Sequence, residues 1–386
     1  MQLKDEFSRV YGAGGEMRVY FAPGRVNLIG EHTDYNGGHV FPCALTIGTY
    51  ACVRLREDRK LRFYSLNFPD AGIVESTLDD GQYREELGFS NYPRGVILEA
   101  AAQGYPASCG MDILYYGTIP NSSGLSSSAS IEVLTGFFIK DLFGFDYDGI
   151  TNAKIGQRAE NSFIGVNCGI MDQFAIAMGR KDHAIFLDTA TLQYEYAPLR
   201  LNGVKIVIMN TNKRRGLGDS KYNERRAECE QALSELKTVT DIATLGDLDE
   251  ERFLQFADAI QSPVCRKRAK HAVFENRRTL RAVEALREDN LTLFGQLMNE
   301  SHVSLRHDYE VTGKELDTLV ETAWEQEGVI GARMTGAGFG GCAVALVKEE
   351  AVPGLIDKVG QIYRQKIGYD ASFYIAEPGD GPARIE

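Results

Sequence analysis

The sequence predicts an α/β protein made of two packed halves, and three observations lead to this prediction. The chain has 386 residues, enough for two or three domains at roughly 150 residues each. Its composition, 44% hydrophobic and 25% charged, is that of an ordinary globular protein. Strand-like and helix-like patterns mix in both parts of the chain. We place a boundary loosely at 180–205, which gives domains of residues 1–195 and 196–386. Because no Pro/Gly-rich linker marks it, we expect the halves to pack tightly.

Three strands are predicted in the first part of the N-terminal half, because the apolar runs are short and apolar residues partly alternate with polar ones. In one of them, Val53 and Leu55 alternate with Arg54 and Arg56, as in a half-buried strand. The predicted strands are residues 17–22, 51–56 and 111–116.

Two helices are predicted after these strands, because apolar residues recur there every three or four positions. The first covers about residues 128–143, and one of its faces carries Ile131, Leu134, Phe138 and Leu142. The second covers about residues 152–163, and its apolar positions four apart are Ile155, Ala159 and Phe163.

The C-terminal half is predicted to mix both kinds of element again. A long helical region begins at residues 222–237, and further helix follows up to about residue 327. Strands are predicted before this helical region at residues 183–187, within the boundary region, and at 204–209, and after it at 342–348 and 371–376. The fold class is therefore α/β (α+β) throughout.

Charge and cysteine content exclude several classes of protein. The net charge of −12 opposes binding to nucleic acid and to anionic membranes. No apolar run approaches the ~18 residues of a membrane span, and the first residues lack the apolar core of a signal peptide. The seven cysteines are an odd number and form no C-x-x-C pair, which favours a reducing, cytoplasmic location. Nothing in the sequence implies a protein partner.

A serine-rich segment at residues 120–130 is the most informative local stretch. It follows a predicted strand and leads into the helix over 128–143. Small residues let the backbone approach an anion, and free amides at a helix N-terminus point toward it. The segment is not a Walker A loop, because no G-x-x-x-x-G-K-[ST] occurs. A phosphate-binding loop and an ordinary Ser-rich loop with an N-cap both remain open.

A second glycine-rich segment, residues 336–341, fits G-x-G-x-x-G but has the wrong context for a dinucleotide site. That motif follows a strand and opens a helix, whereas residues 342–347 read as a strand. The segment is either a tight turn that needs positive φ or a second loop pressed against the same ligand.

A polar segment at residues 24–38 places Arg25, Glu31, His32 and Asp34 within ten residues. Carboxylates accept two hydrogen bonds each, which suits the neighbouring hydroxyls of a sugar. The alternative is a solvated loop, because His-Thr-Asp and Asn-Gly-Gly are also turn sequences.

Taken together, these segments resemble the galactokinases of the GHMP small-molecule kinase superfamily. The resemblance runs from about residue 17 to 376, and its motifs are residues 24–38, 124–130 and 334–341, with further matches at 160–163, 167–173 and 222–225. It implies a ribosomal-protein-like N-terminal domain, a ferredoxin-like C-terminal domain and an active site between them. The implied reaction moves the γ-phosphoryl group of MgATP to the anomeric hydroxyl of α-D-galactose. Galactose 1-phosphate and ADP are the products.

The resemblance also assigns roles to individual residues. Asp172 matches the catalytic aspartate, which accepts or orients the proton of the sugar hydroxyl, and Arg25 matches the catalytic arginine. The positions that match sugar contacts are Glu31, His32, Thr33, Asp34 and Tyr222. Without the motif, Asp172 reads as a helix cap, Arg25 as a surface residue and Tyr222 as a tyrosine at the core edge.

Magnesium and nucleotide positions follow from the same resemblance. Ser128 and Glu160 match the Mg²⁺ ligands, and a hydroxyl with one carboxylate suits this cation. On its own, Glu160 reads as an exposed helix residue. The nucleotide positions are Ser65, Ser122, Ser123, Gly124, Leu125, Ser126, Ser127 and Ser128, and Ser65 rests on the least specific chemistry.

Two further functions stay open beside an active galactokinase. One is a related GHMP kinase for another sugar, such as N-acetylgalactosamine or arabinose. The other is a catalytically silent protein that binds sugar and ATP as a sensor. A basic stretch at residues 264–282 could bind nucleic acid, but it holds one aromatic residue, Phe274, and we interpret it as a solvated helix face.

Overall fold

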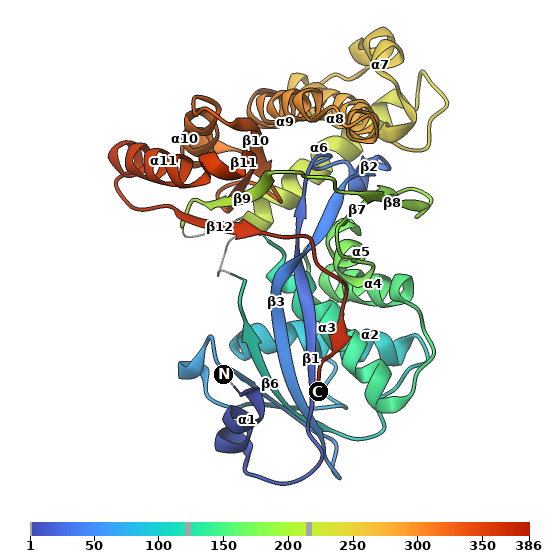
Figure 1. Ribbon diagram of the computed structural model, residues 1–386. Helices are drawn as coiled ribbons and strands as arrows, with labels where there is room; N and C mark the ends of the chain where they lie inside the picture. Colours follow the sequence, from blue (N-terminus) through green and yellow to red (C-terminus); the bar gives the residue numbers. More distant parts are fainter. Residues whose placement is uncertain (1, 120–124, 214–217) are drawn as a thin grey trace.

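The computed structural model describes residues 2–119, 125–213 and 218–386 and has an elongated, two-part shape (Figure 1). One part is built on a six-stranded sheet, in which only the β4–β6 pair is parallel. In spatial order its strands are β13 (Ala383–Arg384), β1 (Arg18–Asn27), β3 (Pro42–Leu55), β6 (Met111–Gly117), β4 (Lys60–Ser65) and β5 (Val74–Thr77). The long strands β1 and β3 run from this part toward the other (Figure 1).

The other part is built on an antiparallel four-stranded sheet. In spatial order its strands are β10 (Val329–Thr335), β11 (Cys342–Lys348), β9 (Val204–Asn210) and β12 (Ser372–Ala376). A small third sheet lies at the junction and consists of β2 (His39–Val40), β7 (His183–Asp188) and β8 (Tyr194–Pro198). Strand β11 is buried over residues 342–347, as a central strand covered on both faces must be.

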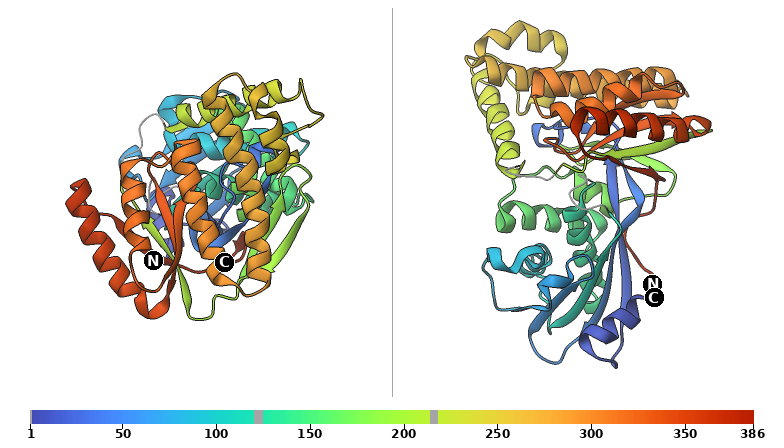
Figure 2. Two further views of the ribbon diagram at one scale, coloured as in Figure 1. Left: turned by 90° about the horizontal axis from the view of Figure 1, so that it is seen from above. Right: turned by 90° about the vertical axis from the view of Figure 1, so that its left-hand side faces the viewer.

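Helices pack against both main sheets. The set that belongs to the first part is α2 (Asn91–Ala102), α3 (Ser127–Phe143), α4 (Gly149–Arg158) and α5 (Met171–Ala177), and α1 (Leu3–Tyr11) packs near the chain ends. The remaining helices are α6 (Gly218–Leu236), α7 (Glu250–Phe256), α8 (Pro263–Arg287), α9 (Leu291–Ser304), α10 (Gly313–Trp324) and α11 (Val352–Ile367). The orange and red helices among them lie together at the end of the molecule away from the six-stranded sheet (Figure 2). Within the described residues, no helix is long and apolar enough to cross a membrane.

The two parts share a hydrophobic core, which confirms the expectation of tight packing. Val26 and Phe41, from the first part, belong to the same buried cluster as Ile208 and Val344 of the second sheet. The C-terminal segment also returns to the first sheet, where β13 pairs with β1 (Figure 1). We therefore propose the division into residues 1–195 and 196–386 with the last residues placed against the N-terminal domain.

Most of the predicted elements are present. The predicted strands correspond to β1, β3, β6, β7, β9, β11 and β12, and the first predicted helix corresponds to α3. The second predicted helix ends as an α-helix at Arg158 and continues as a π-helical turn, Ala159–Ile164, that carries Glu160. Such turns are often found at functional sites.

The interpretation of residues 264–282 as a solvated helix face is wrong for two of its arginines. These residues lie in α8, where Arg268 and Arg278 are almost fully buried. Arg268 Nε lies 2.8 Å from Glu228 Oε2, and Arg278 pairs with Glu275. Part of the positive charge of this helix is therefore neutralised by buried ion pairs, because buried charges need partners.

Candidate active site

The predicted site residues come together at the junction of the two parts. The end of β1 and the loop after it, residues 28–38, face the first turns of α3 and α5. The turn between β10 and β11, residues 336–341, closes against the same loop, since Gly336 N donates to Glu31 Oε1 at 2.8 Å. That turn uses positive φ at four glycines and at Phe339 (59°). The segment is therefore a tight turn with positive φ that packs against the loop at 28–38, and its contact with a ligand stays a prediction.

Asp172 is held by a bidentate ion pair with Arg25. Arg25 Nε lies 2.8 Å from Asp172 Oδ1, and Arg25 Nη2 lies 2.7 Å from Oδ2. The Ser126 hydroxyl donates to the same carboxylate. Burial by itself lowers the pKa of Arg25, but the Asp172 charge outweighs this effect and the net shift is upward. The Arg25 side chain is 3% exposed and that of Asp172 is 30% exposed, so the carboxylate remains accessible while its orientation is fixed.

Asp34 lies close to Asp172 and has no cation of its own among the contacts of the described residues. Its Oδ2 accepts from Met171 N at 3.4 Å. Burial raises the pKa of Asp34 to about 7, and the Asp172 charge adds to this rise. Gly169 makes room for this carboxylate, because a Cβ atom there would overlap it. Asp34 is thus a desolvated acceptor that a ligand hydroxyl would satisfy.

Aromatic rings surround His32. The His32 ring lies 5.6 Å from the Tyr222 ring and 4.7 Å from the Tyr309 ring, measured between centroids. Its Nδ1 is 2.8 Å from the Tyr35 hydroxyl, which in turn is 2.7 Å from the Tyr309 hydroxyl. Burial lowers the pKa of His32 to about 3, so the imidazole is neutral at pH 7. The neutral His32 ring is therefore packed among tyrosine rings, with the backbone of Ala337 as a further polar neighbour.

Glu31 and Thr33 are buried deeper than a surface loop would place them, at 1% and 0% exposure. Glu31 Oε1 accepts from Arg333, Thr335 and Gly336 at 3.3, 3.0 and 2.8 Å. Thr33 Oγ1 lies 2.8 Å from the Gly30 carbonyl and 2.7 Å from the His39 carbonyl. The Thr33 hydroxyl is therefore used to shape the loop.

A carboxylate pair lies behind the first turn of α3. The Gln173 amide donates to Glu160 Oε2 at 2.7 Å and to Glu132 Oε2 at 2.9 Å. Burial raises the pKa of Glu160 to about 7, the Asp172 charge adds to this rise, and a bond with Ser128 opposes it. Ser128 and Glu160 are thus neighbours, and a divalent cation would relieve the cost of burying this carboxylate.

The nucleotide positions are only partly described. Ser122, Ser123 and Gly124 lie outside the described residues. Leu125 is buried and its carbonyl accepts from Arg25 N at 3.3 Å, while Ser127 is exposed at the start of α3. Ser126 has a φ of 59°.

Ser65 ends β4 beside Tyr115 of the neighbouring β6, the strand that leads into the serine-rich segment. The Ser65 side chain is buried and accepts from Asn67 N at 3.2 Å, so its hydroxyl supports a turn.

Several residues of the site were not singled out from the sequence. Glu132 had a usable signal, because it stands four residues after Ser128 and therefore on the same helix face. Gln173 also had a signal in the sequence, since it directly follows the predicted catalytic residue Asp172. Tyr35 had one too, because it lies in the polar segment directly after Asp34. Tyr309 and Arg333 had no local signal, because only the tertiary fold brings them to the loop at residues 28–38.

The fold and the site together define a small-molecule kinase of the GHMP superfamily. The model of the GHMP kinases N terminal domain matches residues 91–180, and that of the GHMP kinases C terminal domain matches residues 282–365. A mevalonate kinase from Methanococcus jannaschii has the same fold, with a TM-score of 0.67 at 19% identity, 95% of this chain and 100% of that chain being covered.

Within this superfamily, the chain belongs to the galactokinase family and has the activity of an ATP-dependent sugar kinase. The galactokinase galactose-binding signature matches residues 5–55. The chain is 58% identical to a galactokinase of Clostridium beijerinckii, over 99% of this chain and 98% of that protein. It is 54% identical to a galactokinase of Bacillus subtilis, over 100% of this chain and 99% of that protein. The crystal structure of Lactococcus lactis galactokinase complexed with galactose superimposes with a TM-score of 0.97 at 51% identity, covering 99% of both chains.

Proposed function

We propose that this chain phosphorylates α-D-galactose at the anomeric hydroxyl with MgATP, the first phosphorylation of galactose catabolism by the Leloir pathway. The observation that supports this most is the Asp172–Arg25 pair, which lies between the polar loop at 28–38 and the start of α3. A sugar on the loop side and a nucleotide on the α3 side would meet at this carboxylate. The galactose bound in the Lactococcus lactis relative supports the choice of sugar.

In the proposed mechanism, Asp172 orients the anomeric hydroxyl and accepts its proton as the new bond to phosphorus forms. Phosphoryl transfer passes through a loose transition state, so orientation and charge compensation contribute most to the rate. Arg25 fixes the rotamer of Asp172 through two hydrogen bonds and places positive charge near the transferring group. The helix N-terminus at Ser127 adds backbone N–H groups on the phosphate side.

The sugar contacts in this proposal are made by Glu31, His32, Asp34 and Tyr222. Asp34 accepts hydroxyl hydrogens, and its desolvation makes each such bond contribute more to affinity. The neutral imidazole of His32 and the ring of Tyr222 line the same space. Thr33 contributes indirectly, because its hydroxyl holds the carbonyls of Gly30 and His39.

We expect Gly169→Ala to weaken galactose binding by about tenfold or more, because the new methyl group would displace the Asp34 carboxylate. The measurement is a calorimetric titration of galactose into the protein without nucleotide. Gly81→Ala is the matched control, since a Cβ atom at Gly81 meets open space. Unchanged affinity in Gly169→Ala would show that the position of Asp34 does not matter for the sugar.

Magnesium is the proposed cofactor, with Ser128 and Glu160 as its protein ligands. The donor set fits, because Mg²⁺ bound to ATP needs only one or two protein oxygens and completes its octahedron with phosphate oxygens and water. Among the described residues, the hydrogen-bond partners of the buried Glu160 carboxylate are Gln173, Cys168 and Ser128, and none of them is basic. When bound, the cation would neutralise charge on the β- and γ-phosphates.

We expect Glu160→Ala to raise the Mg²⁺ concentration for half-maximal rate several-fold while galactose affinity changes less than twofold, because it removes the only carboxylate ligand proposed. Mg²⁺ is titrated at fixed total ATP, and galactose binding is measured separately. Glu251→Ala, at an exposed position of α7, is the control. An unchanged Mg²⁺ dependence would remove Glu160 from the metal site.

Two alternatives are distinguished by one assay. A related sugar kinase would release ADP faster with N-acetylgalactosamine or arabinose than with galactose. A silent sensor would bind galactose and ATP without ADP release. An assay of ADP release over a panel of sugars, with galactose binding measured in parallel, decides among the three functions.

We also propose a cytoplasmic location and no macromolecular partner for the reaction. Cys43, Cys52 and Cys229 have free thiols in the core, as is typical of proteins from a reducing compartment. The net charge of −12 opposes nucleic acid and anionic lipid as partners.

A further inference from the structure

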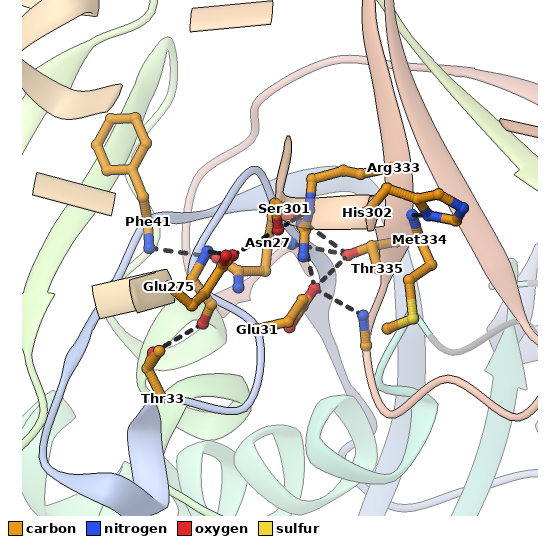
Figure 3. A network of polar contacts seen from close by, with 12 residues as sticks. Asn27, Glu31, Thr33, Phe41, Glu275, Ser301, His302, Arg333, Met334 and Thr335 are labelled. Atoms are coloured by element: carbon orange, nitrogen blue, oxygen red, sulfur yellow. Dashed lines mark hydrogen bonds and ion pairs between the residues drawn. The ribbon is translucent and has the colours of Figure 1, made fainter. Parts of the chain in front are cut away.

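Behind the sugar loop lies a buried polar network that joins both parts of the molecule (Figure 3). Its centre is Arg333, which stands near the end of β10 and has 0% exposure. Arg333 Nη1 donates to the Asn27 carbonyl at 2.9 Å and lies 3.3 Å from Glu31 Oε1. Arg333 Nε donates to Ser301 Oγ at 3.2 Å. A guanidinium buried this completely requires negative charge close by.

Two buried carboxylates supply that charge. Glu31 touches Arg333 directly, and Glu275 reaches it through Ser301, whose hydroxyl donates to Glu275 Oε1 at 2.5 Å (Figure 3). Glu275 Oε1 also accepts from Gly30 N at 3.1 Å, so this carboxylate of α8 bonds both to the loop and, through Ser301, to Arg333. The loop at 28–38 is thereby tied to α8, α9 and β10.

The network also determines how Glu31 is oriented. Among the described residues, the hydrogen bonds that Glu31 accepts through its side chain all end on Oε1, and they come from Arg333, Thr335 and Gly336. Three donors on one oxygen fix the carboxylate in a single orientation and leave Oε2 for a ligand. Met334, between these donors, is itself held because its N–H donates to His302 Nδ1 at 3.2 Å.

We infer that Arg333 is a positioning residue for the sugar site, which acts by holding Glu31 in the orientation that receives galactose. The inference rests on the proposed function of Glu31 as a sugar contact. Arg333 does not reach the reacting atoms, because its contacts are Asn27, Glu31 and Ser301. The Glu31 carboxylate that it holds also accepts from Gly336 N, so the same oxygen joins β10, the sugar loop and the start of the glycine-rich turn.

The test is a double-mutant cycle on galactose affinity, measured by calorimetry on the full-length protein without nucleotide. Arg333→Met is expected to weaken galactose binding by at least about tenfold and to change the KM for ATP by less than about twofold. Arg333→Lys is expected to recover part of the affinity, since it restores the charge without the forked donors. In a Glu31→Gln background, Arg333→Met is expected to add less than about twofold, because its effect passes through Glu31.

Thr335→Val keeps the inference testable if Arg333→Met does not fold. It removes one donor to Glu31 Oε1 without burying an unpaired charge, and it is expected to weaken galactose binding more than ATP binding. Fully additive losses in the cycle, or equal losses for galactose and ATP, would overturn the inference and leave Arg333 as a structural residue. A wild-type protein that does not bind galactose would overturn the proposed function, and with it this inference.

Discussion

Asp172→Asn is expected to lower kcat by a factor of at least about 10² while galactose binding stays measurable. The amide keeps the shape of the side chain and one hydrogen-bonding oxygen, but it neither takes a proton nor carries negative charge. It also places an N–H₂ group opposite Arg25, which can only donate. The two bonds of 2.8 and 2.7 Å therefore cannot both persist, and the orientation of the group is lost together with its basicity.

The measurement is a pre-steady-state and steady-state rate of ADP formation, with galactose affinity determined separately on the same preparation. Asp258→Asn is the matched control, because this side chain is 98% exposed. A variant at residue 172 with near-wild-type kcat would show that phosphoryl transfer needs no carboxylate there. Loss of kcat together with loss of galactose binding would instead indicate a collapsed site.

The parts of the fold that sequence reasoning recovered are those in which one local pattern decides the structure. The apolar face from Ile131 to Leu142 gives α3 nearly residue for residue, because a helix of this length is set by its own periodicity. The run at 342–348 gives β11, since a short, continuously apolar segment between turns fits a buried strand. The glycines at 336–341 predict a turn, and in the structure they have positive φ.

The parts that it could not recover depend on contacts between distant segments. Arg333 has no local feature that marks it, and its importance rests on Asn27 and Glu31, about 300 residues away in the chain. Arg268 reads as solvent-facing because its partner Glu228 lies on another helix, 40 residues earlier in the chain. The return of residues 383–384 to β1 is equally non-local. Such contacts are set by packing, which a pattern along one chain does not encode.

Asp34→Ala is expected to weaken galactose binding and to narrow the preference for galactose over glucose. These two sugars differ only in the orientation of the C4 hydroxyl. If Asp34 accepts the hydrogen of the axial hydroxyl of galactose, glucose leaves that carboxylate without its donor. Buried polar groups left unpaired discriminate by up to roughly 10⁴ to 10⁵, far more than an apolar pocket does.

The wild-type enzyme is expected to show a kcat/KM for galactose at least about a hundredfold above that for glucose. This factor is smaller than the upper limit of roughly 10⁴ to 10⁵ because Asp34 is partly exposed to solvent. Asp34→Ala removes the discriminating partner, so the kcat/KM values for galactose and glucose should approach the same low value. Asp70→Ala, at an exposed position, is the control.

The physical reason for assigning selectivity to Asp34 is the cost of burying its carboxylate without a matching donor. Burial and the neighbouring Asp172 raise the pKa of Asp34 to about 7, although hydrogen bonds from the backbone of Met171 and Tyr35 oppose this rise. A ligand hydroxyl placed against this carboxylate removes much of that cost, and a misplaced hydroxyl removes none of it. Wild-type protein that phosphorylates glucose as well as galactose would contradict this assignment. So would an Asp34→Ala variant with unchanged selectivity, because the residue that distinguishes the two sugars must then lie elsewhere in the loop.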